Sequence, residues 1–135
     1  MNVVIIDAQG GGMGKAITES LKRNFPSLQL TCVGTNALAT SAMLHAGADH
    51  GATGENAIRV CCETADLIIC PIGLILADAM LGEVTSGIAI AIGKSRAHRI
   101  LIPSNRCHTT IAGCQNLSMQ DLIQDVNHKV RLLLE

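Results

Sequence analysis

The N-terminal stretch of this 135-residue chain constrains its fold more than any other segment. The β-branched run from Val3 to Ile6 predicts a buried strand that ends at Asp7, and a glycine-rich segment and a helical pattern follow it. Glycines let the backbone come close to a phosphate, and the free N–H groups at a helix start face it with partial positive charge. This order of strand, glycine turn and helix therefore predicts an anion-binding crevice of the nucleotide type.

Apolar runs of strand length alternate with helical patterns along the rest of the chain. We expect further strands near residues 29–33, 48–51, 66–70, 99–102 and 109–112. Helices are expected over residues 14–24, 37–46, from about 55, and over 74–81, 85–94 and 118–134. Strands that alternate with helices of this length indicate an α/β domain with a mainly parallel sheet. We predict a single Rossmann-like domain over residues 1–135, built as a three-layer sandwich.

The segments that follow the strands are expected to meet in space, because right-handed crossovers place every carboxyl end on one edge of the sheet. Ligands of such sheets bind at that edge. The predicted ligand contacts in the glycine loop are Gln9, Gly10, Gly11, Gly12, Met13, Gly14 and Lys15. Thr35, Asn36, Asn105 and Arg106 are expected to line the rest of the crevice. The Arg106 guanidinium can grip a carboxylate or phosphate with two hydrogen bonds, and Thr35 or Asn36 can also cap the next helix.

Two nucleotide-binding motifs match the loop only in part. The dinucleotide fingerprint G-x-G-x-x-G finds Gly11 and Gly14 but has Gln9 at its first position, and no acid follows the second strand to hold a ribose. The P-loop pattern has Gly14 and Lys15 but lacks its hydroxyl, because Ala16 stands there. A P-loop NTPase is therefore disfavoured, and a nucleotide or dinucleotide remains one alternative among anionic small molecules.

Two other kinds of function compete with ligand binding. The first is an enzyme in the same crevice, NAD(P)-dependent or assisted by a thiol or metal, with Asp7 or Glu55 as acid/base or metal ligand and Cys107 as nucleophile. Neighbouring Cys107 and His108 point to opposite sides of an extended chain and form no nucleophile–base pair unaided. As metal ligands they would need further partners, such as Cys114 or His50, and no spacing among these residues is diagnostic of a metal site. The second alternative is a non-catalytic assembly subunit whose glycines only turn the chain.

Composition excludes several partners. The chain has one Phe and no Trp or Tyr, so it lacks the aromatic platforms that stack single-stranded nucleic acid. A net charge of -1 without a basic run argues against duplex binding. No apolar stretch reaches the roughly 18 residues of a membrane span, and the N-terminus has no charged leader before its strand, so we expect a cytoplasmic protein.

The surface is expected to be shared with other subunits. Charged residues make up only 16% of the chain, against about 25% in typical soluble domains, and the mean hydropathy is +0.36. The apolar region 74–93 is a candidate contact surface, in which Asp78 would be a buried carboxylate that needs a partner. We therefore expect a homo-oligomer.

Several blocks together resemble an uncharacterised family of short bacterial α/β proteins, known only as a domain of unknown function. These blocks are DAQGGGMGK at residues 7–15, GTNALATSAMLHAGADHGATGENAI at 34–58, PIG at 71–73 and ILIPSNRC at 100–107. The resemblance extends over nearly the whole chain and implies a bacterial, cytoplasmic protein. It implies no activity, substrate or catalytic residue.

Overall fold

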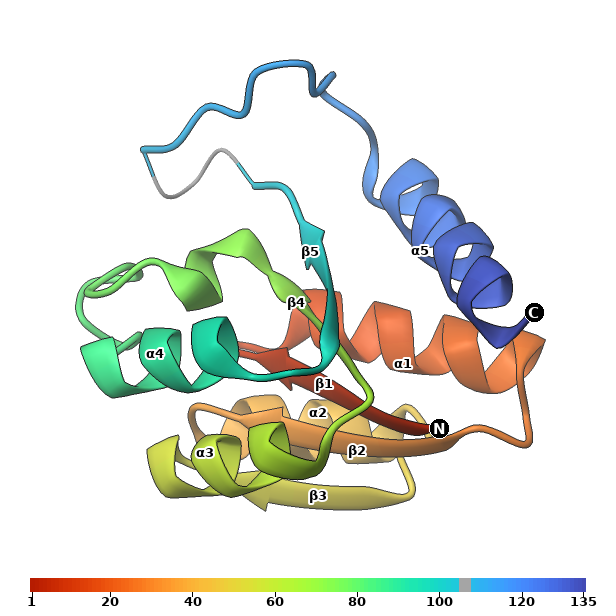
Figure 1. Cartoon of the computed structure of the whole chain (residues 1–135), viewed down its shortest axis with the longest axis horizontal. Helices are drawn as coiled ribbons and strands as arrows, with labels where there is room; N and C mark the ends of the chain where they lie inside the picture. The colour runs from red at the N-terminus through yellow and green to blue at the C-terminus, as the bar shows by residue number, and fades with distance from the viewer. Residues whose placement is uncertain (105–107) are drawn as a thin grey trace.

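Five strands form one parallel sheet in the computed structural model, which describes residues 1–104 and 108–135. Its strand order is β3-β2-β1-β4-β5 (Figure 1). The strands are β1 (Asn2–Asp7), β2 (Gln29–Gly34), β3 (His50–Thr53), β4 (Leu67–Pro71) and β5 (His98–Ile102). This is the order of the first five strands of the dinucleotide-binding Rossmann fold. The predicted α/β class and the parallel sheet are thus confirmed.

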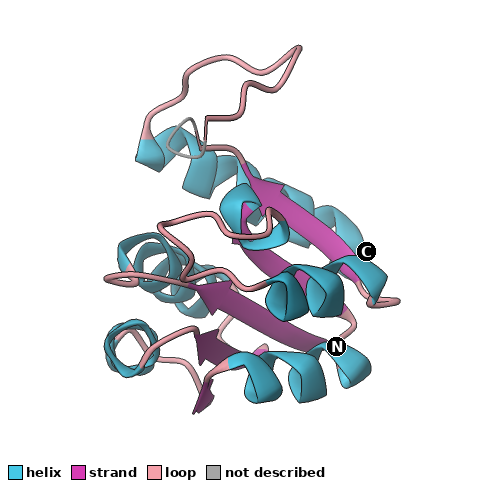
Figure 2. Ribbon diagram, turned by 90° about the vertical axis from the view of Figure 1, so that its left-hand side faces the viewer, coloured by secondary structure: helices cyan, strands magenta, loops and turns pink. Residues whose placement is uncertain are grey.

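Helices cover both faces of the sheet, as Figure 2 shows. One face carries α1 (Gly12–Asn24), α2 (Ala37–His45) and α5 (Met119–Leu134), and the other carries α3 (Glu55–Thr64) and α4 (Ser86–Lys94). Successive side chains of a strand point to opposite faces, so β1 contributes Val3 and Ile5 to the first core and Val4 and Ile6 to the second. The three-layer sandwich is confirmed.

The connections place a crevice beside the central strand. From β1 the chain passes through α1 to β2, whereas α3 leads back across the sheet to β4, on the other side of β1. The helices that follow β1 and β4 therefore lie on opposite faces, and the loops after these two strands diverge. In open α/β sheets this divergence creates the ligand crevice at the carboxyl edge. Here it lies between the glycine loop and the residues after Pro71.

The predicted apolar helix at 74–81 is wrong. A short 3₁₀ helix, η1 (Ile72–Ile75), is followed by turns that extend to residue 83, and the backbone is left-handed at Asp78, Met80 and Leu81. The apolar residues of this segment do not form one continuous helical face. A few of them, such as the fully buried Leu74, anchor the turns in the core. Asp78 is exposed and so does not need the partner that a buried carboxylate would.

Residues 109–112 form no strand in the described part of the chain, against the prediction. Figure 1 shows the segment 108–118, which leads into α5, as an arch beyond the sheet. Most residues at 108–118 are exposed, and a strand needs a neighbour to satisfy its backbone groups. Among the described residues, no helix combines the length and the apolar character needed to cross a membrane.

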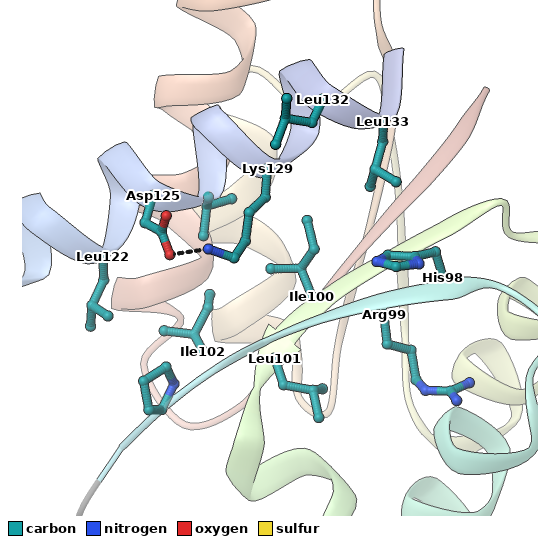
Figure 3. A pocket seen from close by; sticks show the side chains of 12 residues that line it. His98, Arg99, Ile100, Leu101, Ile102, Leu122, Asp125, Lys129, Leu132 and Leu133 are labelled. Carbon is teal, nitrogen blue, oxygen red and sulfur yellow. Dashed lines mark hydrogen bonds and ion pairs between the residues drawn. The ribbon is translucent and has the colours of Figure 1, made fainter. Parts of the chain in front are cut away.

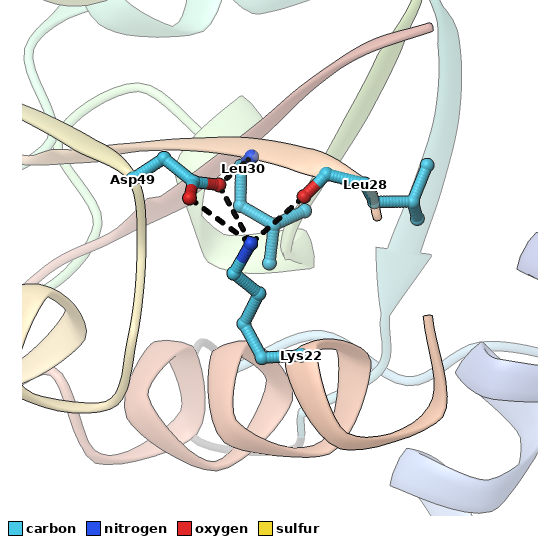
Figure 4. A network of polar contacts seen from close by, with 4 residues as sticks. All are labelled: Lys22, Leu28, Leu30 and Asp49. Atoms are coloured by element: carbon cyan, nitrogen blue, oxygen red, sulfur yellow. Dashed lines mark hydrogen bonds and ion pairs between the residues drawn. The ribbon is translucent and has the colours of Figure 1, made fainter. Parts of the chain in front are cut away.

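A small polar network joins α1 to the sheet on the β2–β3 side (Figure 4). The Lys22 ammonium donates to the Leu28 carbonyl at 2.9 Å and to the Asp49 carboxylate at 2.8 Å, and the Leu30 N–H donates to the same carboxylate at 2.8 Å. The Leu30 hydrogen bond and Lys22 hold the pKa of Asp49 below its ordinary value of 3.8. Asp49 therefore connects two elements through one carboxylate.

Replacing Asp49 by Ala is expected to lower the free energy of unfolding by about 1–3 kcal/mol, because the Leu30 N–H loses its acceptor. Glu19→Ala is the control, since Glu19 pairs with Arg23 across one turn on the exposed face of α1. That change should cost no more than about 0.5 kcal/mol. Because the pKa of Asp49 is lowered in the folded state, its contribution is present above pH 3.8 and is lost as pH falls through the folded pKa. Urea denaturation at several pH values measures the loss of unfolding free energy and its pH dependence. An equal loss in the two variants would contradict the role of Asp49 in joining α1 to the sheet.

Candidate functional site

Two of the loop glycines are required by the fold itself. Gly11 has a φ of 73°, and a Cβ there would lie 2.8 Å from the Cα of Ala39 in α2. A Cβ on Gly14 would lie 2.6 Å from the Met43 sulfur and 2.8 Å from the Cβ of Asp7. The loop and the first turn of α1 are thus pressed against α2 and β1. These contacts explain both glycines without a ligand.

The other two glycines have no such explanation. A Cβ on Gly10 or on Gly12 would meet no atom within 4 Å, and neither residue has a left-handed backbone. Both face a large cleft. Glycine in these places costs backbone entropy and gives nothing to the packing of the chain. What it provides is open backbone at the mouth of the crevice.

Three N–H groups of the loop are free to receive a ligand. Helix α1 has Gly11 as its N-cap residue, which has no side chain to accept a hydrogen bond. Within the described part of the chain, the amides of Gly10, Gly12 and Met13 donate to no acceptor. The first N–H groups of a helix have no intrahelical partner and carry its partial positive charge. The Gly12 and Met13 amides are of this kind, and together with the Gly10 amide of the preceding loop they can hold an anion.

The buried side chain of Asp7 holds the glycine loop in position. Its side chain is buried, with one carboxylate oxygen 2.7 Å from the Gly14 nitrogen and the other 2.8 Å from the Ala8 nitrogen. Burial raises the pKa of Asp7, the two amide hydrogen bonds lower it, and the nearby Glu83 raises it further; the net pKa is above 3.8. Because both oxygens already accept backbone N–H groups, the main role of Asp7 in this geometry is to position the loop.

The cleft has a volume of about 1480 Å³ and three walls. One is the glycine loop, the second is the segment 76–81 after η1, and the third comes from residues around 108–119. Its polar lining includes His108 and Asn116, and its apolar lining includes Met80, Ile111 and Leu117. Among the described residues, no three His, Cys, Asp or Glu side chains gather to hold a metal ion. The cleft can therefore take a polar head at the loop and a partly apolar body.

Thr35 and Asn36 lie at the end of β2, where they contact a residue that sequence reasoning missed. The Glu83 carboxylate accepts from the Asn36 amide at 2.6 Å, the Thr35 hydroxyl at 3.0 Å and the Gln9 N–H at 3.0 Å. The side-chain oxygen Oδ1 of Asn36 also caps α2 by accepting from the Ala39 N–H. No local pattern indicates Glu83, because it is 48 residues from Thr35 in the sequence.

The remaining predicted residues are distributed as follows. Residues 9–13 line the cleft, whereas Gly14 lies buried beneath the loop and Lys15 is exposed on α1, away from the lining. Asn105, Arg106 and Cys107 lie outside the described residues. Glu55 accepts from the Thr85 hydroxyl and joins α3 to α4, away from the cleft. Exposed Cys114 lines the cleft.

A second hollow of about 360 Å³ lies between β5 and α5 (Figure 3). Its lining is mainly apolar, with Ile100 and Ile102 from the strand and Leu122 and Leu133 from the helix. The ion pair between Asp125 and Lys129 points toward it from α5. β5 is the last strand of the sheet, so this hollow borders an unpaired strand edge.

Alanine substitutions separate the two kinds of loop glycine. Gly14→Ala is expected to lower the free energy of unfolding by about 1–3 kcal/mol, because its Cβ overlaps Asp7 and Met43. Gly12→Ala should leave stability unchanged or raise it by about 0.4–1 kcal/mol, because the site is open and the helix gains a better former. Thermal and urea unfolding of the two variants measure this; a destabilised Gly12→Ala protein would contradict the assignment of Gly12 to the ligand side.

Distant likenesses among solved structures include two enzymes. The first is prephenate dehydrogenase from A. aeolicus in complex with hydroxyphenyl propionate and NAD+, with 16% identity and a TM-score of 0.46 over 89% of this chain. The chain spans 45% of that enzyme. The second is a dodecameric FMN-dependent Ubix-like decarboxylase from Escherichia coli O157:H7, with 12% identity and a TM-score of 0.45 over 93% of this chain and 75% of the decarboxylase.

No curated protein matches the sequence. A family model described as a domain of unknown function, DUF3842, matches residues 2–135. The matched residues include the whole glycine loop and every strand and helix of the described structure. The chain belongs to the DUF3842 family.

Proposed function

We propose that this chain binds a small molecule through its phosphate group, at the three open amides of Gly10, Gly12 and Met13. The observation that carries the proposal is the pair of glycines, Gly10 and Gly12, that neither packing nor backbone conformation requires. A glycine loop that opens a helix after a buried strand is a recurrent phosphate site, because the N–H groups and the helix dipole act together. A ligand carboxylate is the alternative anion for the same amides.

The rest of the ligand would lie in the cleft. Its walls combine polar groups such as His108 with apolar side chains such as Met80 and Ile111. Binding sites of this kind take most of their contact area from apolar residues and their orientation from a few polar groups. The ligand that fits is a phosphate ester with a body large enough to reach from the loop to the segment around residue 111.

A thermal-shift panel tests the proposal. Inorganic phosphate, sugar phosphates, flavin nucleotides, NAD(H), NADP(H), ATP, GTP and coenzyme A are added to the purified protein. A ligand at 100 times its dissociation constant should stabilise the folded state by about 2.7 kcal/mol. Gly12→Leu should remove the shift without unfolding the protein, because the side chain enters open space at the loop.

Gly93→Leu is the matched control for that variant. Gly93 also lies in a helix, and a Cβ there meets no atom within 4 Å, but it is in α4 and outside the cleft lining. It should keep the full ligand shift. A panel without any shift would refute the proposal, and so would a shift that Gly12→Leu retains.

We also infer a homo-oligomer, formed by a second copy at the β5 edge. Large apolar side chains are exposed close to this edge, among them Leu132 and Leu133 of α5. Antiparallel pairing of two β5 strands about a two-fold axis at Ile100 would continue the sheet and bring the two α5 helices together in opposite directions. In that arrangement Lys129 of each copy faces Asp125 of the other, so the surface is self-complementary in charge.

Light scattering after size exclusion measures the mass. We expect twice the chain mass of 14.1 kDa at micromolar concentration. Lys129→Asp should give a monomer, because it places four carboxylates at the contact, and the double exchange Asp125→Lys with Lys129→Asp should restore the dimer. A monomeric wild-type protein would refute the oligomer, and a dimer unaffected by Lys129→Asp would refute this interface.

A further inference from the structure

The end of β2 is occupied by a carboxylate from another part of the chain. In dinucleotide-binding sheets an acid that ends the second strand holds the ribose of one nucleoside. Here that strand ends at Gly34 and is followed by Thr35 and Asn36, and the acid is Glu83, from the segment before α4. The carboxylate is therefore in the region of a ribose-binding acid, but it points back into the protein.

Three donors in the described part of the chain hydrogen-bond to this carboxylate. Its Oε1 accepts from Asn36 and from Thr35, and its Oε2 accepts from the Gln9 N–H at 3.0 Å. The Asn36 amide donates a second hydrogen bond to the Gln9 carbonyl at 2.9 Å. These contacts bridge the loop after β1 to the end of β2. Neither Thr35 nor Asn36 lines the cleft, in agreement with this bridge.

Glu83 is held in place by its own backbone surroundings. Its N–H donates to the Met80 carbonyl at 3.2 Å, and the next residue, Val84, is fully buried. The Val84 carbonyl accepts from the Asp78 N–H at 2.7 Å, and the Val84 N–H donates to Ala79 at 3.2 Å. A set of tight turns anchored in the core therefore supports the carboxylate.

We propose that Glu83 is a specificity residue that closes the β2 side of the crevice and restricts the ligand to a phosphomonoester. This inference rests on the proposed function and names its ligand class. A dinucleotide places its pyrophosphate at the loop and one nucleoside on each side of β1. Here the β2 side is bridged, and the Glu83 charge also repels a second phosphate. The β4 side remains open as the cleft, so a phosphate with one body fits.

Isothermal titration with paired probes tests the inference. Mononucleotides (AMP and FMN) and ribose 5-phosphate represent monoesters, and NAD+ represents dinucleotides. The wild-type protein is expected to bind at least one monoester about tenfold or more tightly than NAD+. Glu83→Ala should reduce this ratio about tenfold or more, because it removes the bridge and frees the three donors. Glu63→Ala, on the exposed face of α3, is the matched control and should leave the ratio unchanged.

Glu83→Gln is the second variant, in case the alanine protein does not fold. It keeps the size of the side chain and loses the charge, so it should reduce the ratio in the same direction by a smaller factor. Wild-type protein that binds NAD+ as tightly as a monoester would overturn the inference and leave the proposed phosphate site intact. So would an unchanged ratio in folded Glu83 variants. Absence of binding to every probe, inorganic phosphate included, would refute the proposed function and this inference with it.

Discussion

The contact between Asp7 and the Gly14 amide determines the shape of the whole carboxyl edge. The carboxylate is buried at the end of the central strand, and its oxygens take the amides on either side of the loop, those of Ala8 and Gly14. The close approach leaves no room for a Cβ on Gly14. Because Asp7 satisfies the third amide of α1, the helix can start at Gly12 with its first two amides open. The loop, the helix start and the mouth of the cleft all follow from this geometry.

Burying that carboxylate is unfavourable, and the loop compensates for it. Burial raises the pKa of Asp7, whereas the hydrogen bonds from Gly14 and Ala8 lower it. Asp49 shows the opposite balance, since hydrogen bonding and Lys22 dominate at a more exposed position and its pKa falls. The two residues show that the effect of the same side chain on stability depends on its burial. The carboxylate of Asp7 holds a loop and is disfavoured by burial, whereas the more exposed carboxylate of Asp49 is favoured by its hydrogen bonds.

The sequence predicted the architecture because its strongest signals are local. The β-branched run of β1, the glycines after it and the helical period of α1 lie within one stretch, and they indicate strand, turn and helix without long-range information. The helix predicted at 74–81 is wrong because an apolar composition alone does not distinguish a helix from turns. Here turns are held by a few buried side chains such as Leu74. Four loop glycines look alike in the sequence, yet two are demanded by packing and two are not. Their neighbours in space, such as Ala39 and Met43, distinguish them.

Glu83 shows why the candidate site could be predicted only in part. Its partners Gln9, Thr35 and Asn36 were each identified from their positions after strands, since topology places such segments together. What topology does not specify is which side chain fills the space between them, and here a residue from a third loop does so. The absence of an acid after β2 argues against a dinucleotide from sequence alone, and the position of Glu83 strengthens that argument. The crevice has an acid on its β2 side, but one that is already hydrogen-bonded to the chain's own donors.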